Sequence, residues 1–360
     1  MRDLDATSGG PSRSVPALAA AQSQLLGIQV SVVFRDRGNI RAQMDESDVR
    51  FLPLKGSAKA QLKGISTSAE TPVFHVHGLW DPIVHSATRL AHRNSWPCVV
   101  STRGMLAGWA LRHKALKKKL AWALYQRRDL RDADCLVASS PFEAECIDGL
   151  LPGARIEVIP NGCDERPAVA GPVFPLPAVE SRWALALGRL HPVKGYAELI
   201  DAWARLRPHA WTLAIAGPDE DGYRAELEQQ IQSQNLEGQV VLLGEVDDAA
   251  KWSLLDQCEL FLAPSHTENF GMAIAEALQS GTPVLTTTGT PWQELPECRC
   301  GWWIPLNEAT LIDTLRNALD TPAVGLQEMG ERGRRLIREK YSWNGVAART
   351  IEVYRSIMAK

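Results

Sequence analysis

Short apolar runs alternate with longer amphipathic stretches along most of the chain. The runs 183–187, 211–216 and 240–243 hold consecutive apolar residues, and each comes before a stretch with apolar residues at helical spacing. Runs of this length predict buried parallel strands, and the amphipathic stretches predict helices that cover them. The alternation therefore predicts an α/β fold built from parallel, Rossmann-like sheets.

The pattern also predicts two domains. With 360 residues the chain is long for a single core. Residues 166–181 are rich in Pro and Gly and show no periodicity, which predicts a linker. We therefore expect a first domain at 1–165, a second domain at 182–343 and a final helix at 344–360.

In the first domain the expected elements are less regular. The predicted strands, in chain order, are 28–34, 71–79, 98–101, 135–139 and 156–160. A helix is predicted at 141–150. The pattern gives no assignment for 35–70, although this segment contains the short apolar piece 49–54.

The stretch 263–295 carries the strongest candidate chemistry. A strand ends at Pro264, a helix follows Gly271, and Glu268 and Glu276 lie eight residues apart, about two helical turns. Between them, the backbone N–H groups of Asn269, Phe270 and Gly271 lie at a helix N-terminus, where an anion is favoured.

Carboxylates accept hydrogen bonds from sugar hydroxyls, and amides bind anionic oxygens, so this segment suits a nucleotide sugar. The alternative is a surface helix with two solvated glutamates. The flanking order Phe270-Gly271, Gly281 and Pro283-Val284 disfavours that alternative.

A second candidate loop follows the predicted strand 183–187. Arg189 and Lys194 lie five residues apart between Gly188 and Gly195. Arg189 offers a bidentate contact and Lys194 a point charge, which predicts a clamp for a pyrophosphate. A solvated loop is the alternative. The order of Gly, Lys and Ser/Thr excludes a Walker loop.

Near the N-terminus, the pair Gly9 and Gly10 precedes a predicted Ala/Leu-rich helix. Glycines there let the main chain approach a phosphate or a sugar closely, but a glycine pair before a helix is also an ordinary turn. Both interpretations stay open.

The ordered set around Glu268 and Glu276 resembles the retaining glycosyltransferases of family 4, which have the GT-B fold. The resemblance implies that Glu268 holds the hydroxyls of the donor sugar and Glu276 those of the ribose. Arg189 and Lys194 match the phosphate-binding pair of the family. The turns at Gly217 and Gly244 resemble its nucleotide contacts. It also implies that the last helix crosses back to the first domain.

The chain departs from the family pattern at two places. The family's glycine loop normally follows a first buried strand, whereas only Met1–Asp5 precede it here, so we expect a missing or truncated strand. Arg103 stands where the family commonly has a histidine that contacts the donor sugar. We assign Arg103 to an anionic acceptor or the leaving phosphate, and His77, at a strand end, to acceptor contact. A zinc pair of His75 and His77 lacks an evident third ligand.

Charge and composition limit the partners. A net charge of −3 gives no general attraction to nucleic acid. No apolar run is long enough to span a bilayer and no signal peptide opens the chain, so we expect a cytoplasmic protein. The basic stretch Arg112–Arg131 has an apolar side. It predicts either peripheral contact with an anionic membrane or a helix packed on its own domain.

The predicted reaction is transfer of a sugar from a nucleoside-diphosphate donor to a glycan or glycolipid acceptor, in surface polysaccharide or glycolipid assembly. No Asp-x-Asp motif lies in a suitable loop, so we expect no metal or other cofactor. Two alternatives remain: a GT-B sugar-nucleotide epimerase and a non-catalytic subunit that binds sugar nucleotides. The absence of a G-x-G-x-x-G motif argues against a dehydrogenase.

Overall fold

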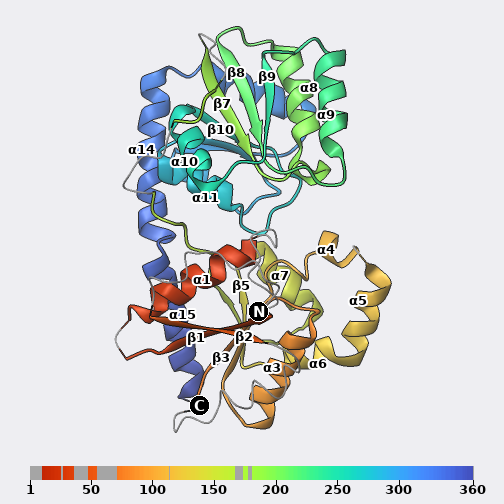
Figure 1. The fold of residues 1–360 in the computed structure, drawn as a ribbon, viewed down its shortest axis with the longest axis vertical. Helices are drawn as coiled ribbons and strands as arrows, with labels where there is room; N and C mark the ends of the chain where they lie inside the picture. The colour runs from red at the N-terminus through yellow and green to blue at the C-terminus, as the bar shows by residue number, and fades with distance from the viewer. Residues whose placement is uncertain are drawn as a thin grey trace. The chain divides into compact units, whose positions relative to one another are not determined.

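The structure is a computed structural model that describes residues 10–25, 27–35, 48–54, 71–112, 114–166, 173–176 and 181–359. Contacts divide the chain into two compact units (Figure 1). The first unit contains residues 1–162 and 343–360, and the second contains 163–342. The helix α15 (Trp343–Met358) thus belongs to the first unit, although it follows the second unit in the sequence.

The second unit is built on a six-stranded parallel sheet with the order β12-β11-β10-β7-β8-β9. The strands are β7 (Arg182–Leu187), β8 (Trp211–Ala216), β9 (Val240–Gly244), β10 (Leu260–Ala263), β11 (Val284–Thr287) and β12 (Gly301–Ile304). Chain order runs outward from β7 in one direction and from β10 in the other. In such sheets ligands bind where the order reverses, outside the carboxyl ends of the two central strands.

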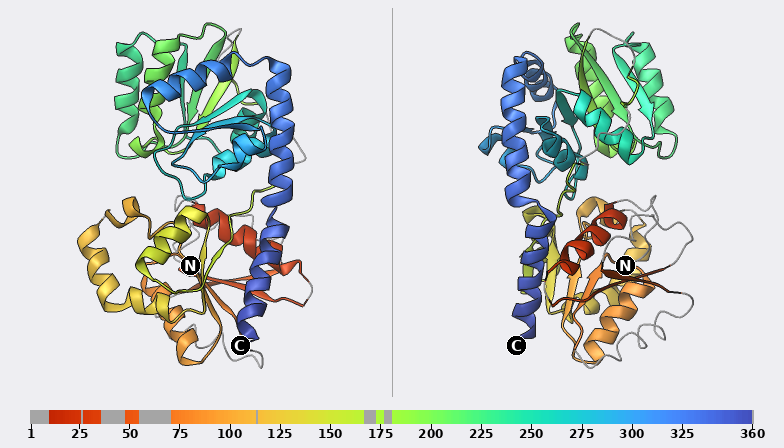
Figure 2. Two further views of the ribbon diagram at one scale, coloured as in Figure 1. Left: turned by 180° about the vertical axis from the view of Figure 1, so that it is seen from behind. Right: turned by 60° about the vertical axis from the view of Figure 1, so that its left-hand side comes forward.

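Helices cover both faces of this sheet (Figure 2). One apolar cluster joins the sheet to α8 (Tyr196–Leu206), α9 (Tyr223–Ser233) and α13 (Glu308–Leu319). The opposite cluster includes residues of α10 (Asp248–Gln257), α11 (Met272–Ser280), α12 (Glu294–Glu297) and α14 (Ala323–Lys340). Burial on both faces explains why these strands read as continuous apolar runs in the sequence.

The first unit holds a four-stranded parallel sheet with the order β3-β4-β5-β6. Its strands are β3 (Phe74–His77), β4 (Cys98–Ser101), β5 (Cys135–Ala138) and β6 (Ile156–Val158). The described helices are α1 (Gly10–Ser23), α3 (Pro82–Arg93), α4 (Gly108–Arg112), α5 (Ala115–Ala121), α6 (Arg127–Arg131), α7 (Pro141–Leu150) and α15, with the π-helix η3 (Trp122–Gln126).

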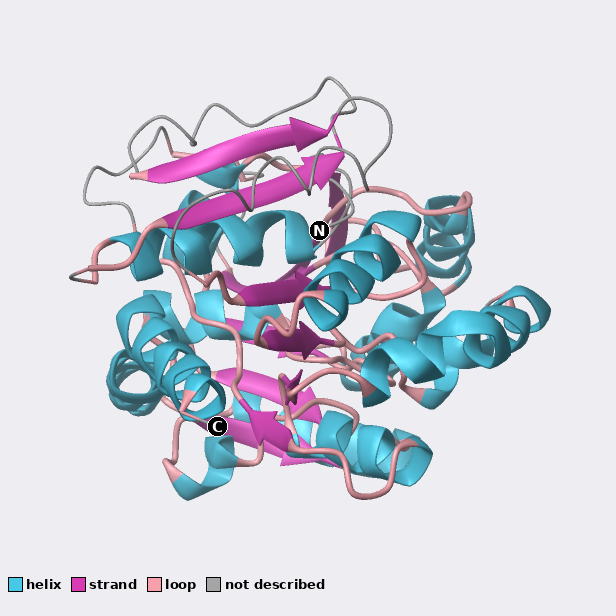
Figure 3. Ribbon diagram, turned by 90° about the horizontal axis from the view of Figure 1, so that it is seen from below, coloured by secondary structure: helices cyan, strands magenta, loops and turns pink. Residues whose placement is uncertain are grey.

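Two further strands form a separate parallel pair, β1 (Val30–Arg35) and β2 (Val49–Leu54) (Figure 3). The segment 49–54, for which the apolar pattern gave no assignment, is therefore a strand. Its burial does not alternate: Val49 and Leu54, at its two ends, are buried on opposite faces and belong to different apolar clusters, which explains why the sequence pattern was not recognised. Residues 1–9, where the first strand was expected to be truncated, lie outside the described residues.

The basic stretch Arg112–Arg131 is helical over most of its length but is not one regular α-helix, since α4 ends at Arg112 and α5, η3 and α6 follow from Ala115. Lys114 adopts a left-handed conformation with φ 53°, which ends the run of α4 before α5 begins. The Lys118 ammonium donates to the Ala110 carbonyl at 2.5 Å and so satisfies a terminal carbonyl of α4. The wider turn of η3 ends at Gln126. The Oε1 atom of this residue accepts from the Trp80 N–H at 2.9 Å.

Candidate functional site

Three glycines lie side by side at the carboxyl ends of β7, β8 and β9. The Gly188 N–H donates to the Ala216 carbonyl at 2.9 Å, and the Gly217 N–H donates to the Gly244 carbonyl at 2.7 Å. A Cβ on Gly217 would overlap the Gly188 carbonyl. The backbones can approach this closely only because position 217 carries no side chain. The predicted contacts Gly188, Gly217 and Gly244 thus lie together at one edge of the sheet, with Gly217 buried and the other two partly exposed.

The structure brings Lys194 and Glu268 into direct contact at this edge of the sheet. Lys194 ends a 3₁₀ turn after β7, and Glu268 lies in the loop after β10. These two strands are neighbours in the sheet. The Lys194 ammonium donates to the Glu268 carboxylate, and both side chains are about four-fifths buried (19% and 20% exposed). The loop is held by the Glu268 N–H, which donates to the Gly289 carbonyl at 2.8 Å. The pair therefore lies at the position where the strand order reverses.

Arg189 lies on the same strand end but has a different partner. Its guanidinium pairs with Glu220 and its side chain is 54% exposed. Sequence reasoning did not single out Glu220, although it lies in the turn after β8. The charge of Arg189 is thus compensated by Glu220, and Arg189 does not join Lys194 in a two-residue clamp.

The loop before α11 is anchored from the interior. The Phe270 side chain is 4% exposed and packs against the rings of Trp292 and Tyr341, with centroids 5.3 and 5.6 Å away. The Trp292 indole donates to the Phe270 carbonyl at 2.6 Å. Gly271 begins α11 with a positive φ of 83°, which a side chain would disfavour. A ligand can therefore contact Phe270 only at its backbone. The same holds for a ligand that binds the backbone amides of the neighbouring Asn269 and Gly271.

Glu276 has a partner that the sequence analysis missed. The Lys251 ammonium, on α10, donates to Glu276 Oε1 at 2.6 Å, and the two side chains are only 8% and 7% exposed. Asp248 Oδ1 lies 3.5 Å from the same ammonium. The signal was a lysine beside Trp252 in an otherwise apolar part of a helix, because a buried cation requires a partner.

The N-terminal glycines contribute little that the structure can test. Gly9 lies outside the described residues. Gly10 is the first residue of α1, is exposed, and an added Cβ there would contact nothing within 4 Å. Packing in the described structure therefore does not require glycine at position 10.

In the first unit, the predicted acceptor-side residues His77 and Arg103 contact each other. One Arg103 nitrogen donates to His77 Nδ1 at 3.0 Å and another to the Asn161 side-chain oxygen. Burial lowers the pKa of Arg103 to about 10 and holds the pKa of His77 well below its usual value. His77 is 9% exposed, so it is placed to orient Arg103 rather than to touch a ligand.

Arg103 has no carboxylate within ion-pair distance among the described residues. Its loop is organised by the buried Glu143, which accepts from the Thr102 hydroxyl, the Gly104 N–H and the Ser139 N–H. Sequence reasoning missed Glu143. The arrangement places a positively charged side chain at the carboxyl end of β4, with the buried Glu143 carboxylate near it but not in a direct ion pair among the described residues.

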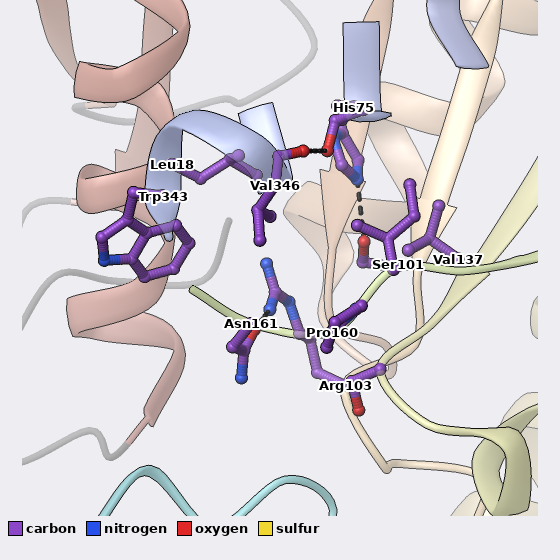
Figure 4. A pocket seen from close by; sticks show the side chains of 12 residues that line it. Leu18, His75, Ser101, Arg103, Val137, Pro160, Asn161, Trp343 and Val346 are labelled. Atoms are coloured by element: carbon purple, nitrogen blue, oxygen red, sulfur yellow. Dashed lines mark hydrogen bonds between the residues drawn. The ribbon is translucent and has the colours of Figure 1, made fainter. Parts of the chain in front are cut away.

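His75 makes a hydrogen bond to Ser101 (Figure 4) and a second one, to Tyr354, that joins this region to α15. Its Nδ1 lies 2.5 Å from the Tyr354 hydroxyl and its Nε2 lies 2.8 Å from the Ser101 hydroxyl. Burial, with the nearby Arg103 charge, lowers the pKa of His75 to about 3. One of these partners, Ser101, lies on the neighbouring strand β4, and the other, Tyr354, lies on α15. A cavity of about 20 Å³, room for one water, is lined by His75, Ser101 and Arg103.

The two remaining features concern the described residues only: a group of metal ligands and a membrane-spanning helix. Within these ranges, no three or more His, Cys, Asp or Glu side chains are grouped so that they could hold a metal ion. No helix in the described part of the chain is both long and apolar enough to cross a bilayer.

Residues 175–336 match the family model described as "Glycosyl transferases group 1", and residues 9–162 match the "Glycosyl transferase 4-like domain". A glycogen synthase of Mycobacterium tuberculosis is 28% identical over 319 residues, covering 84% of this chain and 72% of its own. A GDP-mannose:cellobiosyl-diphosphopolyprenol alpha-mannosyltransferase of Komagataeibacter xylinus is 25% identical, covering 100% and 92%.

Among solved structures, the Anabaena protein Alr3699/HepE in complex with UDP-glucose is similar in fold. Its TM-score is 0.75 at 19% identity, over 99% of this chain and 98% of that chain.

Proposed function

The chain has the GT-B fold and belongs to the group 1 glycosyltransferases of family 4, and we propose that it moves a sugar from a nucleoside-diphosphate donor to a hydroxyl acceptor. We propose that the anomeric configuration is retained. The observation that carries this proposal is the contact of Lys194 with Glu268 at the sheet's reversal point. The donor class agrees with the UDP-glucose bound by the similar Anabaena protein.

The departing nucleoside diphosphate gains negative charge as the glycosidic bond breaks, and a transferase must stabilise that charge. Lys194 supplies a partly buried ammonium, and the Gly188 and Gly217 main chain allows a diphosphate to approach closely. The amides at the start of α11 and the exposed Arg189 add further positive potential. These groups provide the charge stabilisation that other transferases obtain from a metal, so the proposed reaction requires none.

Glu268 has a second function in this proposal. While it pairs with Lys194, it can accept hydrogen bonds from the donor sugar's hydroxyls through its remaining carboxylate lone pairs. The ribose hydroxyls are assigned to Glu276, whose carboxylate the Lys251 ammonium holds in place. The leaving phosphate accepts the proton of the acceptor hydroxyl.

The acceptor is assigned to the first unit. Arg103 has a positive charge that forms no direct ion pair among the described residues, and His77 and Asn161 hold its guanidinium in one orientation. This favours an acceptor with an anionic group, such as a phosphate next to the reacting sugar. The name of the Komagataeibacter relative contains an acceptor of that class, a sugar on a diphosphopolyprenol.

A lipid-linked acceptor requires contact with a membrane, and the surface around α5 is suited to it. Leu116, Leu120 and Leu124 are 84%, 61% and 71% exposed, at four-residue spacing. The exposed cations around them are Lys114, Lys117, Lys119, Arg127 and Arg128. Asp129, the one acid between 108 and 131, is buried against His85. We call these leucines and cations the basic leucine surface.

We assign this surface to the headgroup region of an anionic bilayer, in surface polysaccharide or glycolipid assembly at the inner face of the membrane. Exposed leucines enter the boundary of the acyl chains while lysines and arginines contact anionic headgroups. A second copy of the chain would bring the same positive charges to the same place, which disfavours self-association.

A panel of nucleotide sugars tests the donor assignment. A ligand that binds only the folded chain raises its melting temperature by mass action, so the cognate donor should stabilise the protein where the free sugar does not. Incubation of that donor with candidate acceptors then separates the alternatives. Product formed only with an acceptor supports transfer, whereas an altered donor or free sugar formed without one supports an epimerase. Binding without any turnover supports a non-catalytic subunit.

A further inference from the structure

Tyr196 is a fully buried tyrosine beside the proposed donor site that the mechanism above does not use. It is the first residue of α8 and follows Gly195, whose φ is 70°. Its residue exposure is 2%, and its ring belongs to the apolar cluster on one face of the sheet. A phenylalanine would fill the same space, so the hydroxyl needs a separate explanation.

The hydroxyl lies at the carboxyl end of β7, next to Lys194. A Cβ built on Gly188 would be 3.1 Å from the Tyr196 hydroxyl and 3.4 Å from the Lys194 ammonium nitrogen. The two groups therefore face the same point of exposed main chain. A phosphate that approached Gly188 would meet both.

The charges around this hydroxyl are those of the proposed donor site. Burial and the Glu268 carboxylate raise the pKa of Tyr196 above its usual value, and Arg189 acts in the opposite direction. The phenol thus keeps its proton throughout the neutral range and can donate it in a hydrogen bond.

Within the described ranges, no hydrogen bond to the Tyr196 hydroxyl is formed by another residue, and the hydroxyl is not one of the polar atoms that are both buried and unpaired. It therefore retains access from outside the protein. A donor in this position, beside an ammonium and over glycine main chain, matches an anionic oxygen of a ligand.

We propose that the Tyr196 hydroxyl donates a hydrogen bond to the donor's diphosphate, at the phosphate that Lys194 contacts, and helps to stabilise it as the leaving group. This rests on the proposed function, because it assumes that a nucleoside diphosphate occupies this edge of the sheet. It adds a neutral donor to the charged groups already assigned there.

The test compares Tyr196→Phe with Tyr223→Phe in the full-length chain. Tyr223 is a matched control, since it is also a buried tyrosine that begins a helix, α9, directly after a left-handed glycine. Calorimetric titration with UDP, GDP and the corresponding nucleosides gives the affinities. We expect Tyr196→Phe to weaken binding of the diphosphate about 10-fold and kcat by about 10- to 100-fold, because a hydrogen bond to a charged group is lost. The nucleoside affinity and the Tyr223→Phe variant should match wild type.

Each outcome decides the proposal. Equal diphosphate affinity and kcat in Tyr196→Phe and wild type would overturn the tyrosine's role alone, and so would an equal loss for diphosphate and nucleoside. A wild-type protein that binds neither diphosphate would overturn the proposed function as well. If the phenylalanine variant does not fold, 3-fluorotyrosine at position 196 keeps the ring and gives a more acidic hydroxyl. Tighter diphosphate binding by that protein supports the proposal, and unchanged binding contradicts it.

Discussion

The two units differ in how fully each polar group is compensated. In the second unit, Lys194 pairs with Glu268, Arg189 with Glu220 and Lys251 with Glu276. In the first unit, Arg103 has only neutral hydrogen-bond partners among the described residues, and of the cations in the basic leucine surface only Arg128 forms an ion pair there, with Asp132. Compensated charges suit a preorganised pocket for one type of ligand, whereas uncompensated charges suit variable, anionic partners.

The largest difference should appear when the Lys194 and Glu268 pair is broken. We expect Lys194→Ala and Glu268→Ala each to reduce sugar transfer by at least about 1,000-fold, because a charge that stabilises the leaving group or orients the sugar is lost. Transfer is measured with the cognate donor and acceptor, and circular dichroism checks the fold. Arg205→Ala, which breaks the exposed pair with Glu308 on the same unit, should leave transfer unchanged. Near-normal turnover by either site variant would contradict the assignment.

The second prediction concerns the stability of the second unit. Lys251→Met leaves the Glu276 carboxylate buried without its partner, and we expect a loss of about 3 kcal/mol in unfolding free energy. Hydrogen exchange at the β10 and β11 amides measures this locally. The double variant Lys251→Met with Glu276→Leu should recover much of the loss. Arg205→Met is the exposed control, for which we expect about 0–1 kcal/mol. A similar loss of unfolding free energy in Lys251→Met and Arg205→Met would show that the buried pair stabilises the fold no more than the exposed pair does.

The third prediction tests the basic leucine surface of the first unit. Replacing Leu116, Leu120 and Leu124 with Gln should reduce binding to phosphatidylglycerol-containing vesicles at least about 10-fold, since buried leucine side chains supply much of the affinity. Val324→Gln is the control, because Val324 is 67% exposed on the second unit. Sedimentation with anionic and with neutral vesicles gives the comparison. Equal binding to the two vesicle types, or self-association that the leucine changes abolish, would replace the membrane assignment.

The smallest effect is a pH dependence of the first unit. The pKa of His75 is about 3 in the folded chain and near 6.5 in the unfolded chain. Between these pH values the unfolded chain binds more protons than the folded chain. The contribution of the neutral, buried His75 to the free energy of unfolding is therefore complete above pH 6.5 and is lost as the pH falls. The loss is about 1.4 kcal/mol per pH unit for each such histidine. Hydrogen exchange of β3 and β4 at pH 7 and 5.5 measures it, and His75→Asn should flatten the dependence. A wild-type stability that is unchanged across this interval would be inconsistent with a neutral buried His75.

The sequence predicted the regular parts of the fold well. The helix 141–150 has the predicted bounds, because Pro141 follows Ser140, whose side chain accepts from the Glu143 N–H at the start of the helix. Local signals of this kind are visible in a single sequence. Lys194 and Glu268 were each predicted to contact the donor, but their direct contact was not predicted, because it depends on β7 and β10 being neighbours in the sheet.

The features that sequence reasoning missed depend on tertiary contacts. The break at Lys114 requires a left-handed residue in a segment with strong helical periodicity. Lys251 and Glu276 lie on two different helices and are 25 residues apart along the chain. The Tyr196 hydroxyl gave no signal, since the ring alone satisfied the apolar pattern of α8.

The most direct test of the central claim is the affinity of the full-length protein for a nucleoside diphosphate, compared with the matching nucleoside, in wild type and Lys194→Ala. The account predicts that wild type binds the diphosphate at least about 100-fold more tightly than the nucleoside, and that Lys194→Ala removes most of this preference. An equal preference in both proteins would show that the diphosphate does not bind at Lys194.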